Sequence, residues 1–348
     1  MISFLRAAVI LVTTAGLAAP AAARDHIWIV GSGTAHPFTA AVAKRVAAAA
    51  GGPAPIVEHT GTTLALAYLC AATGAPRPNA ASVTRRMKKR EFDTCQKNGV
   101  GEIVEIPIGL DILVVAQSKA GPPLRLTLGQ MFLALAKDIP DGDGELGANP
   151  HHKWSEIDRS LPDVRIDVRM LPETSGTREA LQELFLLKGA QGIPELARLM
   201  AQDSSLRKRV RAMRSDHPFV AVHEDQSVIA RELVRNPNAV GVFGYRFLQA
   251  NKETLRGVTI EGAEPTEENA YAGRYSGTRR LYVYVNKGEI GAVAGLDRLP
   301  AEFMSSEALG PEGYLLALGF VPLPIEELVK SMALAKAMPP LRRELLPD

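Results

Sequence analysis

The sequence contains little cysteine, few aromatic residues and almost no net charge. Its 348 residues include 2 cysteines and 5% aromatic residues, and the formal net charge is +2. Two cysteines cannot form a four-cysteine zinc site or a disulfide-dense scaffold, and a dedicated nucleic-acid binder would carry a basic excess. The length and the 46% hydrophobic content allow one or two domains with a sizeable core. The composition therefore excludes a disordered chain, a collagen and a coiled coil.

Residues 1–23 have the pattern of a secretory signal peptide. Arg6 gives the short positive region, residues 7–19 form an apolar run, and Pro20 precedes the small residues 21–23. The run is too short to span a bilayer, which takes about 20 apolar residues. An uncleaved anchor or a buried helix is the alternative interpretation. The pattern predicts export from the cytoplasm.

Export decides how the two cysteines are interpreted. Cys70 and Cys95 lie 25 positions apart, and an exported chain meets an oxidising compartment in which disulfides persist. A disulfide between them is the prediction, and two buried free thiols are the alternative. No histidine and asparagine constellation indicates a catalytic cysteine.

Short apolar runs alternate with helical stretches along the rest of the chain. Strands are predicted at residues 26–30, 56–59, 102–106, 112–116, 165–169, 240–243 and 281–285. Helices are predicted at residues 37–50, 64–72 and 128–136, and a further helix opens at residues 174–177 and continues through residue 187. Strands that alternate with helices indicate α/β architecture with largely parallel sheets.

Three predicted strands end in clusters of glycine and hydroxyl residues that begin a helix. The clusters are Gly31–Thr34, Thr60–Thr63 and Thr174–Thr177. The first N–H groups of a helix have no intrahelical partner and lie at the positive end of its dipole. Each cluster alone is an ordinary helix cap. Three in one chain predict helix ends that converge on an anion.

Other chemistry finds little support in the sequence. Gly31-Ser32-Gly33 lacks the third glycine of a dinucleotide fingerprint, and no Walker A sequence or Gly-x-Ser-x-Gly elbow occurs. The acidic positions 141, 143 and 145 lack a complete calcium loop, and His151-His152 lacks further ligands. We therefore expect no metal and no cofactor. Among the cations, Arg85 and above all Arg178 are the candidates for an oxyanion contact.

An ordered series of motifs carries a resemblance to a known family. The most diagnostic motif is Thr174-Ser175-Gly176-Thr177-Arg178, and residues 30–39, 58–70 and 84–100 are similar to three further regions of the family. Residues 126–137, 240–245, 281–285, 309–314 and 319–324 extend the similarity. On these motifs the chain resembles the periplasmic phosphate-binding proteins, the solute receptors of phosphate ABC importers.

The resemblance implies a fold and a function. It implies a two-lobe α/β periplasmic binding protein of the type II-like kind, with residues 24–112 and 258–348 in the first lobe and residues 113–257 in the second. The ligand would be inorganic phosphate, held in a cleft between the lobes and delivered to an inner-membrane ABC permease. The protein would be a periplasmic monomer that catalyses no reaction.

The resemblance also implies the phosphate contacts. In this sequence they are Gly33, Thr34, Ala35, Thr62, Thr84, Arg85, Ser175, Gly176, Thr177 and Arg178.

Departures from the family pattern leave the ligand open. Thr63-Leu64-Ala65 stands where relatives usually carry glycines, and some branches carry, at the position of Arg85, an aspartate that accepts a proton from phosphate. Glu173, or a residue in the segment 224–226, would supply the acceptor here. Another tetrahedral oxyanion or a role in phosphate sensing is the nearest alternative. A secreted phosphohydrolase with Ser175 or Thr177 as nucleophile is the rival from another class.

Overall fold

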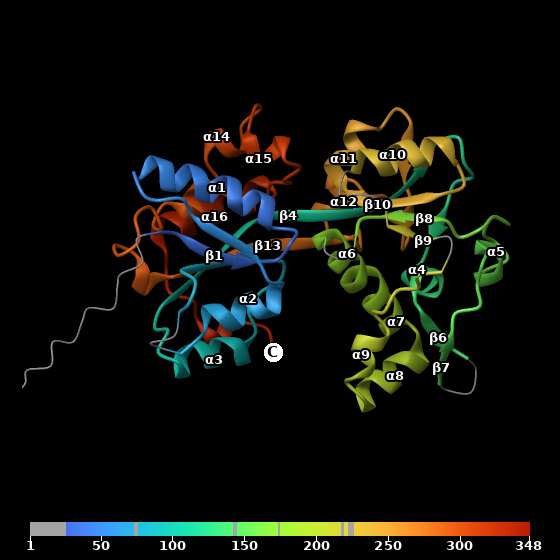
Figure 1. Cartoon of the computed structure of the whole chain (residues 1–348), viewed down its shortest axis with the longest axis horizontal. Helices are drawn as coiled ribbons and strands as arrows, with labels where there is room; N and C mark the ends of the chain where they lie inside the picture. Colours follow the sequence, from blue (N-terminus) through green and yellow to red (C-terminus); the bar gives the residue numbers. More distant parts are fainter. Residues whose placement is uncertain (1–25, 73–75, 142–144, 173–174, 217–218, 222–225) are drawn as a thin grey trace, which may run out of the picture.

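The structure is a computed structural model that describes residues 26–72, 76–141, 145–172, 175–216, 219–221 and 226–348. The expected signal peptide and Glu173 lie outside the described residues, as do residues 224–225. Two lobes lie side by side, and strands β4 (Ile103–Ser118) and β13 (Thr278–Asn286) run between them (Figure 1). The α/β architecture with two lobes agrees with the sequence prediction.

One continuous sheet passes through both lobes. Its strand order is β2 (Ile56–His59), β1 (Trp28–Gly31), β3 (Ala80–Val83), β13, β4, β10 (Val240–Gly244), β8 (Val168–Met170) and β9 (Phe219–Ala221), with β11 (Leu255–Gly257) paired to β4. The outer strands of each lobe are parallel, as the sequence predicts, but β13 and β10 run antiparallel to β4. The sheet is therefore mixed. The sequence did not predict the antiparallel pairs, because strands that return from distant parts of the chain leave no trace in the local alternation.

The strand β4 replaces two strands expected at residues 102–106 and 112–116. The register between β13 and β4 skips Ile108, so a bulge absorbs the irregularity beside Pro107. Gly109 allows a close approach, since a Cβ atom there would lie 2.3 Å from Cζ of Phe320. The strand continues through this point and becomes the physical link between the lobes.

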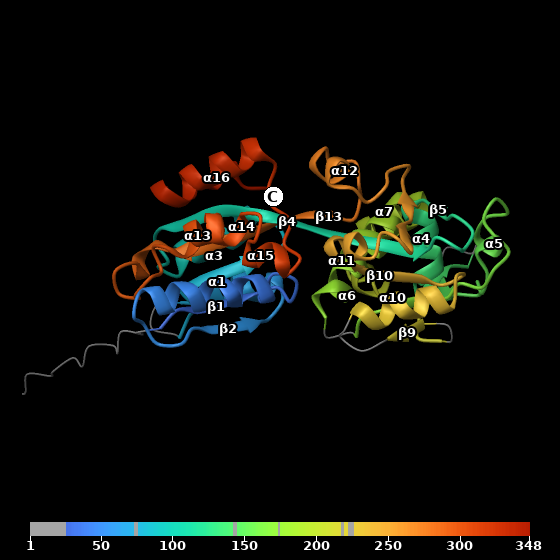
Figure 2. The ribbon, with the colours of Figure 1, turned by 90° about the horizontal axis from the view of Figure 1, so that it is seen from above.

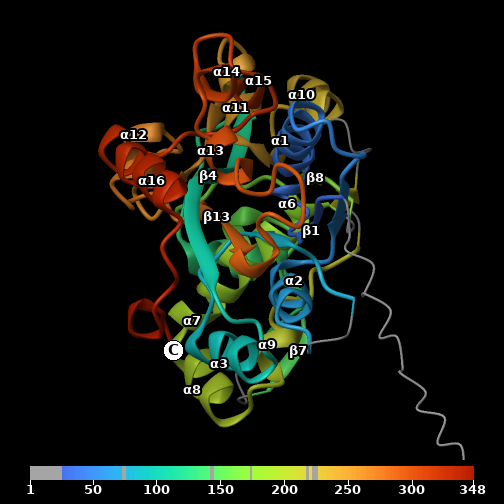
Figure 3. The same ribbon diagram turned by 90° about the vertical axis from the view of Figure 1, so that its left-hand side faces the viewer.

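The first lobe has a three-stranded parallel unit with helices on both faces. Its strands are β1 (Trp28–Gly31), β2 (Ile56–His59) and β3 (Ala80–Val83). Its helices are α1 (His36–Ala49), α2 (Thr62–Leu69), α3 (Lys89–Lys97), α13 (Leu299–Glu302), α14 (Ser306–Leu309), α15 (Tyr314–Ala317) and α16 (Ile325–Ala337). Figures 2 and 3 show α16 on one side of β4 and α1 on the other.

Two apolar cores hold the first lobe together. Val42, Val283 and Phe303 belong to the core on which α1 packs, and Leu66 and Cys95 belong to the core that includes α2 and α3. Cys70 and Cys95 form a disulfide that joins the end of α2 to α3. The predicted pair is thus present in the structure.

The second lobe packs around one larger core. Its strands are β8 (Val168–Met170), β9 (Phe219–Ala221) and β10 (Val240–Gly244), with the short pairs β5 (Arg125–Leu126) to β12 (Thr259–Ile260) and β6 (Asp138–Pro140) to β7 (Leu146–Ala148). Its helices are α4 (Leu128–Leu135), α5 (Trp154–Ile157), α6 (Gly176–Leu181), a π-helical segment (Gln182–Leu187), α7 (Lys188–Gly192), α8 (Pro194–Gln202), α9 (Leu206–Arg209), α10 (Gln226–Arg235), α11 (Tyr245–Ala250) and α12 (Glu267–Tyr271).

The chain crosses between the lobes near Leu113 and near Gly277. From Leu113 onward β4 pairs with β10 of the second lobe, and the Leu113 amide donates to the Gly277 carbonyl at 2.9 Å. The sequence placed the return near Gly257. Val258, Ala270 and Tyr275 instead pack in the core of the second lobe, so this part of the boundary moves about twenty residues towards the C-terminus.

None of the helices in the described part of the chain combines the length and the apolar character that crossing a membrane requires.

Candidate functional site

The carboxyl ends of the parallel strands of the first lobe meet at one edge of the sheet. Gly31, at the end of β1, pairs with His59 of β2 and with Ser82 of β3. Helix α1 begins just beyond β1 and helix α2 just beyond β2. Gly61 precedes α2 with φ of 80°, a conformation that glycine adopts at little cost. Two helix N-termini therefore lie at the same edge.

Three threonine hydroxyls from the first lobe gather at this edge. Thr34 precedes α1, Thr62 is the first residue of α2, and Thr84 follows β3. The hydroxyls of Thr62 and Thr84 lie 3.0 Å apart, and the Thr84 amide donates to Thr62 Oγ1 at 3.3 Å. Both residues are buried, so the hydroxyls belong to an interior polar site.

Arg279 of β13 joins these hydroxyls, and sequence reasoning missed it. Its Nη2 donates to Thr34 Oγ1 at 2.6 Å, its Nη1 to Thr84 Oγ1 at 3.3 Å, and its Nε to Asp111 Oδ2 at 2.9 Å. The side chain is only 6% exposed. A buried guanidinium beside hydroxyls and helix N-termini is a strong feature for binding an oxyanion.

The second lobe meets this group at the start of α6. Ser175 caps the helix, and its Oγ accepts from the Arg178 amide at 3.2 Å. Thr34 Oγ1 donates to the Gly176 carbonyl at 3.0 Å across the interface. A Cβ atom on Gly176 would lie 2.1 Å from the Thr34 amide nitrogen. The structure thus brings Thr34, Thr62, Thr84 and Gly176 into one group.

The remaining residues predicted for the second lobe lie in the first turn of α6. Thr177 is half-buried there. Arg178 is buried, and its guanidinium lies against the sulfur of Met170 at the end of β8. That contact is within the second lobe.

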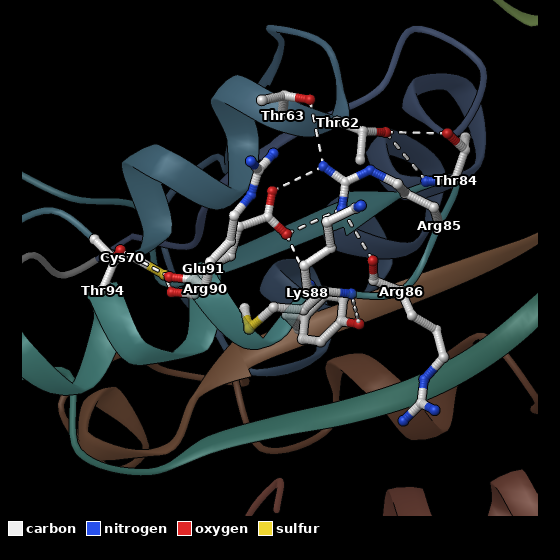
Figure 4. Close-up of polar contacts among 12 residues, drawn as sticks. Thr62, Thr63, Cys70, Thr84, Arg85, Arg86, Lys88, Arg90, Glu91 and Thr94 are labelled. Carbon is white, nitrogen blue, oxygen red and sulfur yellow. Dashed lines mark hydrogen bonds and ion pairs between the residues drawn. The ribbon is translucent and has the colours of Figure 1, made fainter. Parts of the chain in front are cut away.

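Arg85 makes its contacts inside the first lobe (Figure 4). Its Nη1 and Nη2 donate to the two carboxylate oxygens of Glu91 at 3.0 and 2.8 Å, and Nη2 also donates to Thr63 Oγ1 at 3.3 Å. Burial opposes the charge of Glu91, but hydrogen bonds from Arg85 and from the Lys88 amide hold the pKa of Glu91 below its usual value. This fork joins Arg85 to α3.

Two carboxylates of the second lobe face the same edge. Glu183 Oε2 accepts from Arg279 Nη1 at 3.3 Å. Glu179 Oε1 would lie 3.7 Å from a Cβ atom on Gly61, at the start of α2. Burial raises the pKa of Glu179, and the charge of Glu183 adds to the rise, although Arg279 opposes it.

A pair of histidines lies near the start of α1. The rings of His36 and His59 meet edge to face with centroids 5.7 Å apart. Burial lowers the pKa of His36, and the neighbouring His59 lowers it further. Within the described ranges, no group of three or more His, Cys, Asp and Glu side chains has an arrangement that could hold a metal ion.

A family model described as PBP superfamily domain matches residues 17–307. The chain belongs to this superfamily.

Individual proteins extend this result. Protein SphX of Synechococcus elongatus is 22% identical over 213 residues, which cover 60% of this chain and 53% of that protein. The chain thus spans about half of the length of that curated relative.

Solved structures agree with the two-lobe fold. A structure titled a possible phosphate binding protein from Planctomyces limnophilus matches with a TM-score of 0.65 and 21% identity, covering 90% of this chain and 97% of that one. An ABC-type phosphate transport receptor from Vibrio cholerae matches with a TM-score of 0.58 and 16% identity, covering 86% of this chain and 100% of the other. At such identities the likeness shows the fold.

Proposed function

We propose that this protein is a periplasmic solute-binding protein that captures inorganic phosphate between its lobes and delivers it to an ABC permease. The observation that carries the proposal is the buried Arg279 guanidinium, which contacts the hydroxyls of Thr34 and Thr84 where Gly176 of the second lobe meets the first. The identity of the ligand is inferred from the resemblance of the motifs and from the names of the similar structures.

The chemistry of the site suits a tetrahedral oxyanion. A guanidinium donates two parallel hydrogen bonds to such an ion. Threonine hydroxyls both donate and accept, and helix N-termini present amides at the positive end of a dipole. Together these groups replace the hydration shell of the ion held between the lobes.

The proposed contacts follow the sequence prediction and add one residue. Arg279 joins Gly33, Thr34, Ala35, Thr62, Thr84, Arg85, Ser175, Gly176, Thr177 and Arg178. In this proposal Arg85 also holds the loop after β3 against Glu91. Glu173 stays the proposed proton acceptor, and Glu179 is a second candidate because burial raises its pKa.

The proposal also covers the localisation of the protein, its oligomeric state and catalysis. Residues 1–23 direct the protein to the periplasm, where it acts as a monomer without catalysing a reaction.

A chromogenic phosphate ester assay with and without divalent metal tests the rival phosphohydrolase. Release of chromophore that depends on Ser175 or Thr177 would contradict the receptor assignment.

Calorimetric titration of anion-free protein with phosphate, arsenate and sulfate tests the ligand. We expect phosphate to bind and sulfate to give no heat. Arg279→Met is expected to weaken phosphate binding at least tenfold, since hydrogen bonds to charged groups contribute about 1.5–3 kcal/mol.

The neighbouring Arg280→Met is the matched control, because Arg280 pairs with Glu327 outside the site, with Nη2 donating to Oε1 at 2.8 Å. Phosphate binding that survives Arg279→Met, or an equal response to sulfate, would overturn the assignment.

A further inference from the structure

One ion pair connects the second lobe to the buried arginine of the site. Glu183 Oε2 lies 3.3 Å from Arg279 Nη1. Glu183 belongs to the π-helical segment that follows α6, and π-helical turns occur often at functional sites. Its side chain is 38% exposed, whereas that of Arg279 is 6% exposed. The carboxylate can therefore leave this contact for solvent, and the guanidinium cannot.

The other donors of Arg279 have partners from the first lobe and from β4. Nε faces Asp111, and Nη2 faces Thr34. Nη1 is shared between the Thr84 hydroxyl and Glu183. Nη1 is thus the donor whose partners come from both lobes.

Glu183 and a bound oxyanion would both accept a hydrogen bond from Arg279 Nη1. Each supplies negatively charged oxygens that accept from a guanidinium N–H. An oxyanion between the lobes beside Thr34 and Thr84 would take the Nη1 N–H that Glu183 holds. Two like charges cannot share that donor without repulsion.

Lys188 is a second cation near Glu183 with which the carboxylate can interact. Lys188 begins α7, and its Nζ donates to the Ser276 carbonyl at 3.5 Å. Burial lowers the pKa of Lys188, while the charge of Glu183 opposes this fall. The carboxylate thus lies close to Arg279 of the site and to Lys188 outside it. The hydrogen bond to Glu91 raises the pKa of Arg85 and the charge of Glu183 adds to the rise, so Glu183 lies near Arg85 as well.

We propose that Glu183 is an affinity-determining residue that competes with the bound anion for Arg279. The inference rests on the proposed function, because it takes Arg279 as the residue that holds the anion. When the anion binds, Glu183 exchanges Arg279 for Lys188 and solvent. When the anion leaves, Glu183 takes its place and keeps the second lobe against the first.

Affinity measurements on three variants test the competition. Glu183→Gln removes the charge of the competitor and is expected to tighten phosphate binding about tenfold. A change of this size results when the fraction of protein molecules able to bind the anion rises from about a tenth to nearly all. Glu183→Asp keeps the charge but is shorter by one methylene, and it is expected to behave like Glu183→Gln. Exposed Glu253 of the second lobe gives the matched control Glu253→Gln, which is expected to bind like wild type.

The outcomes separate competition from other roles of Glu183. Weaker phosphate binding by Glu183→Gln would make Glu183 a contact of the anion and overturn the proposal. Unchanged binding would overturn it too. If Glu183→Asp behaved like wild type, the effect would come from charge at a distance rather than from the Arg279 contact, which also contradicts the proposal.

Small-angle X-ray scattering separates this inference from the proposed function. In anion-free protein, Glu183→Gln is expected to have a larger radius of gyration than wild type, because the contact between the lobes is lost. A wild type that binds no phosphate would overturn the proposed function, whereas the scattering comparison needs no ligand and tests the contact between Glu183 and Arg279 by itself. Equal radii in anion-free protein would overturn the inference.

Discussion

Arg279 and Asp111 lie directly opposite one another in the paired strands β13 and β4, and Arg279 Nε donates to Asp111 Oδ2 at 2.9 Å. Both residues lie within two positions of the lobe crossings at Leu113 and Gly277. The pair therefore fixes the guanidinium on the strands about which the lobes would move. Thr34 Oγ1 and Thr84 Oγ1 of the first lobe accept hydrogen bonds from its Nη2 and Nη1, and Glu183 of the second lobe also accepts from Nη1.

Asp111→Asn is expected to lower both stability and anion affinity. The Arg279 and Asp111 side chains are 6% and 16% exposed. Loss of a hydrogen-bonded charge from a buried pair costs about 2 kcal/mol. Urea unfolding and phosphate titration measure the two effects.

An exposed pair provides the control for this change. Arg343 donates to Asp93 through Nε at 2.6 Å and Nη2 at 2.9 Å, and both side chains are about half exposed. Asp93→Asn is expected to leave stability and affinity unchanged, because exposed pairs contribute little. Equal effects of the two substitutions would show that the burial of Asp111 has no importance.

The sequence pointed to the hydroxyl residues of the candidate site but not to Arg279. Thr34, Thr62 and Gly176 stand at helix starts, and a helix start is a local pattern that a sequence displays. Thr84 follows β3 and was expected only from the family resemblance. Arg279 stands on a strand, and its partners come from distant segments. Such a convergence depends on the strand order, which the local alternation does not contain.

A signal for Arg279 was nevertheless present. Arg279 and Arg280 precede an apolar strand, and alternation sends neighbouring side chains to opposite faces. Asp111 interrupts the apolar run 109–116. An acidic residue in one buried strand and an arginine in the other predict an ion pair, because a buried charge needs a partner. The course of β4 through both lobes was missed because a bulge hides its continuity.

Gly176→Ala is expected to prevent the lobes from closing. Its Cβ atom would lie 2.1 Å from the Thr34 amide nitrogen and 2.7 Å from Thr34 Oγ1. Since backbone atoms of both lobes are involved, the clash is relieved only by separating the lobes. We expect at least tenfold weaker phosphate binding, with a larger radius of gyration in small-angle scattering.

Gly192→Ala is the matched control for this substitution. A Cβ atom on Gly192, at the end of α7, would meet nothing within 4 Å. This variant is expected to bind phosphate like wild type. Normal binding by Gly176→Ala would show that the contact between Thr34 and Gly176 is not needed for the bound state.

Thr62→Val is expected to weaken binding and to destabilise the first lobe. The substitution keeps the shape but removes the hydroxyl that accepts from the Thr84 amide. A buried donor left without its acceptor costs about 1–3 kcal/mol. Thermal unfolding and phosphate titration measure the loss.

Thr63→Val tests whether position matters more than residue type. Thr63 is exposed, and its hydroxyl accepts from Arg85 Nη2 at 3.3 Å. Surface changes of this kind alter stability by less than about 0.5 kcal/mol. If Thr63→Val impaired phosphate binding as much as Thr62→Val, the group formed by Thr62 and Thr84 would lose its special role.

Glu179 is expected to make stability depend on pH. Burial, with a smaller contribution from Glu183, raises the pKa of Glu179 above its usual value near 4.5, although Arg279 opposes the rise. The folded protein thus binds this proton more tightly than the unfolded chain does. The stabilisation is complete below pH 4.5 and is lost as the pH rises through the raised pKa.

Urea unfolding between pH 4 and pH 8 isolates this contribution. Glu179→Gln keeps the side chain neutral at every pH, so its stability relative to wild type should increase as the pH rises. Glu253→Gln, at an exposed position, should show no such trend. A parallel pH dependence for wild type and Glu179→Gln would mean that the carboxylate ionises without cost beside α2. The positive ends of the helix dipoles, rather than burial, would then control the charge of this site.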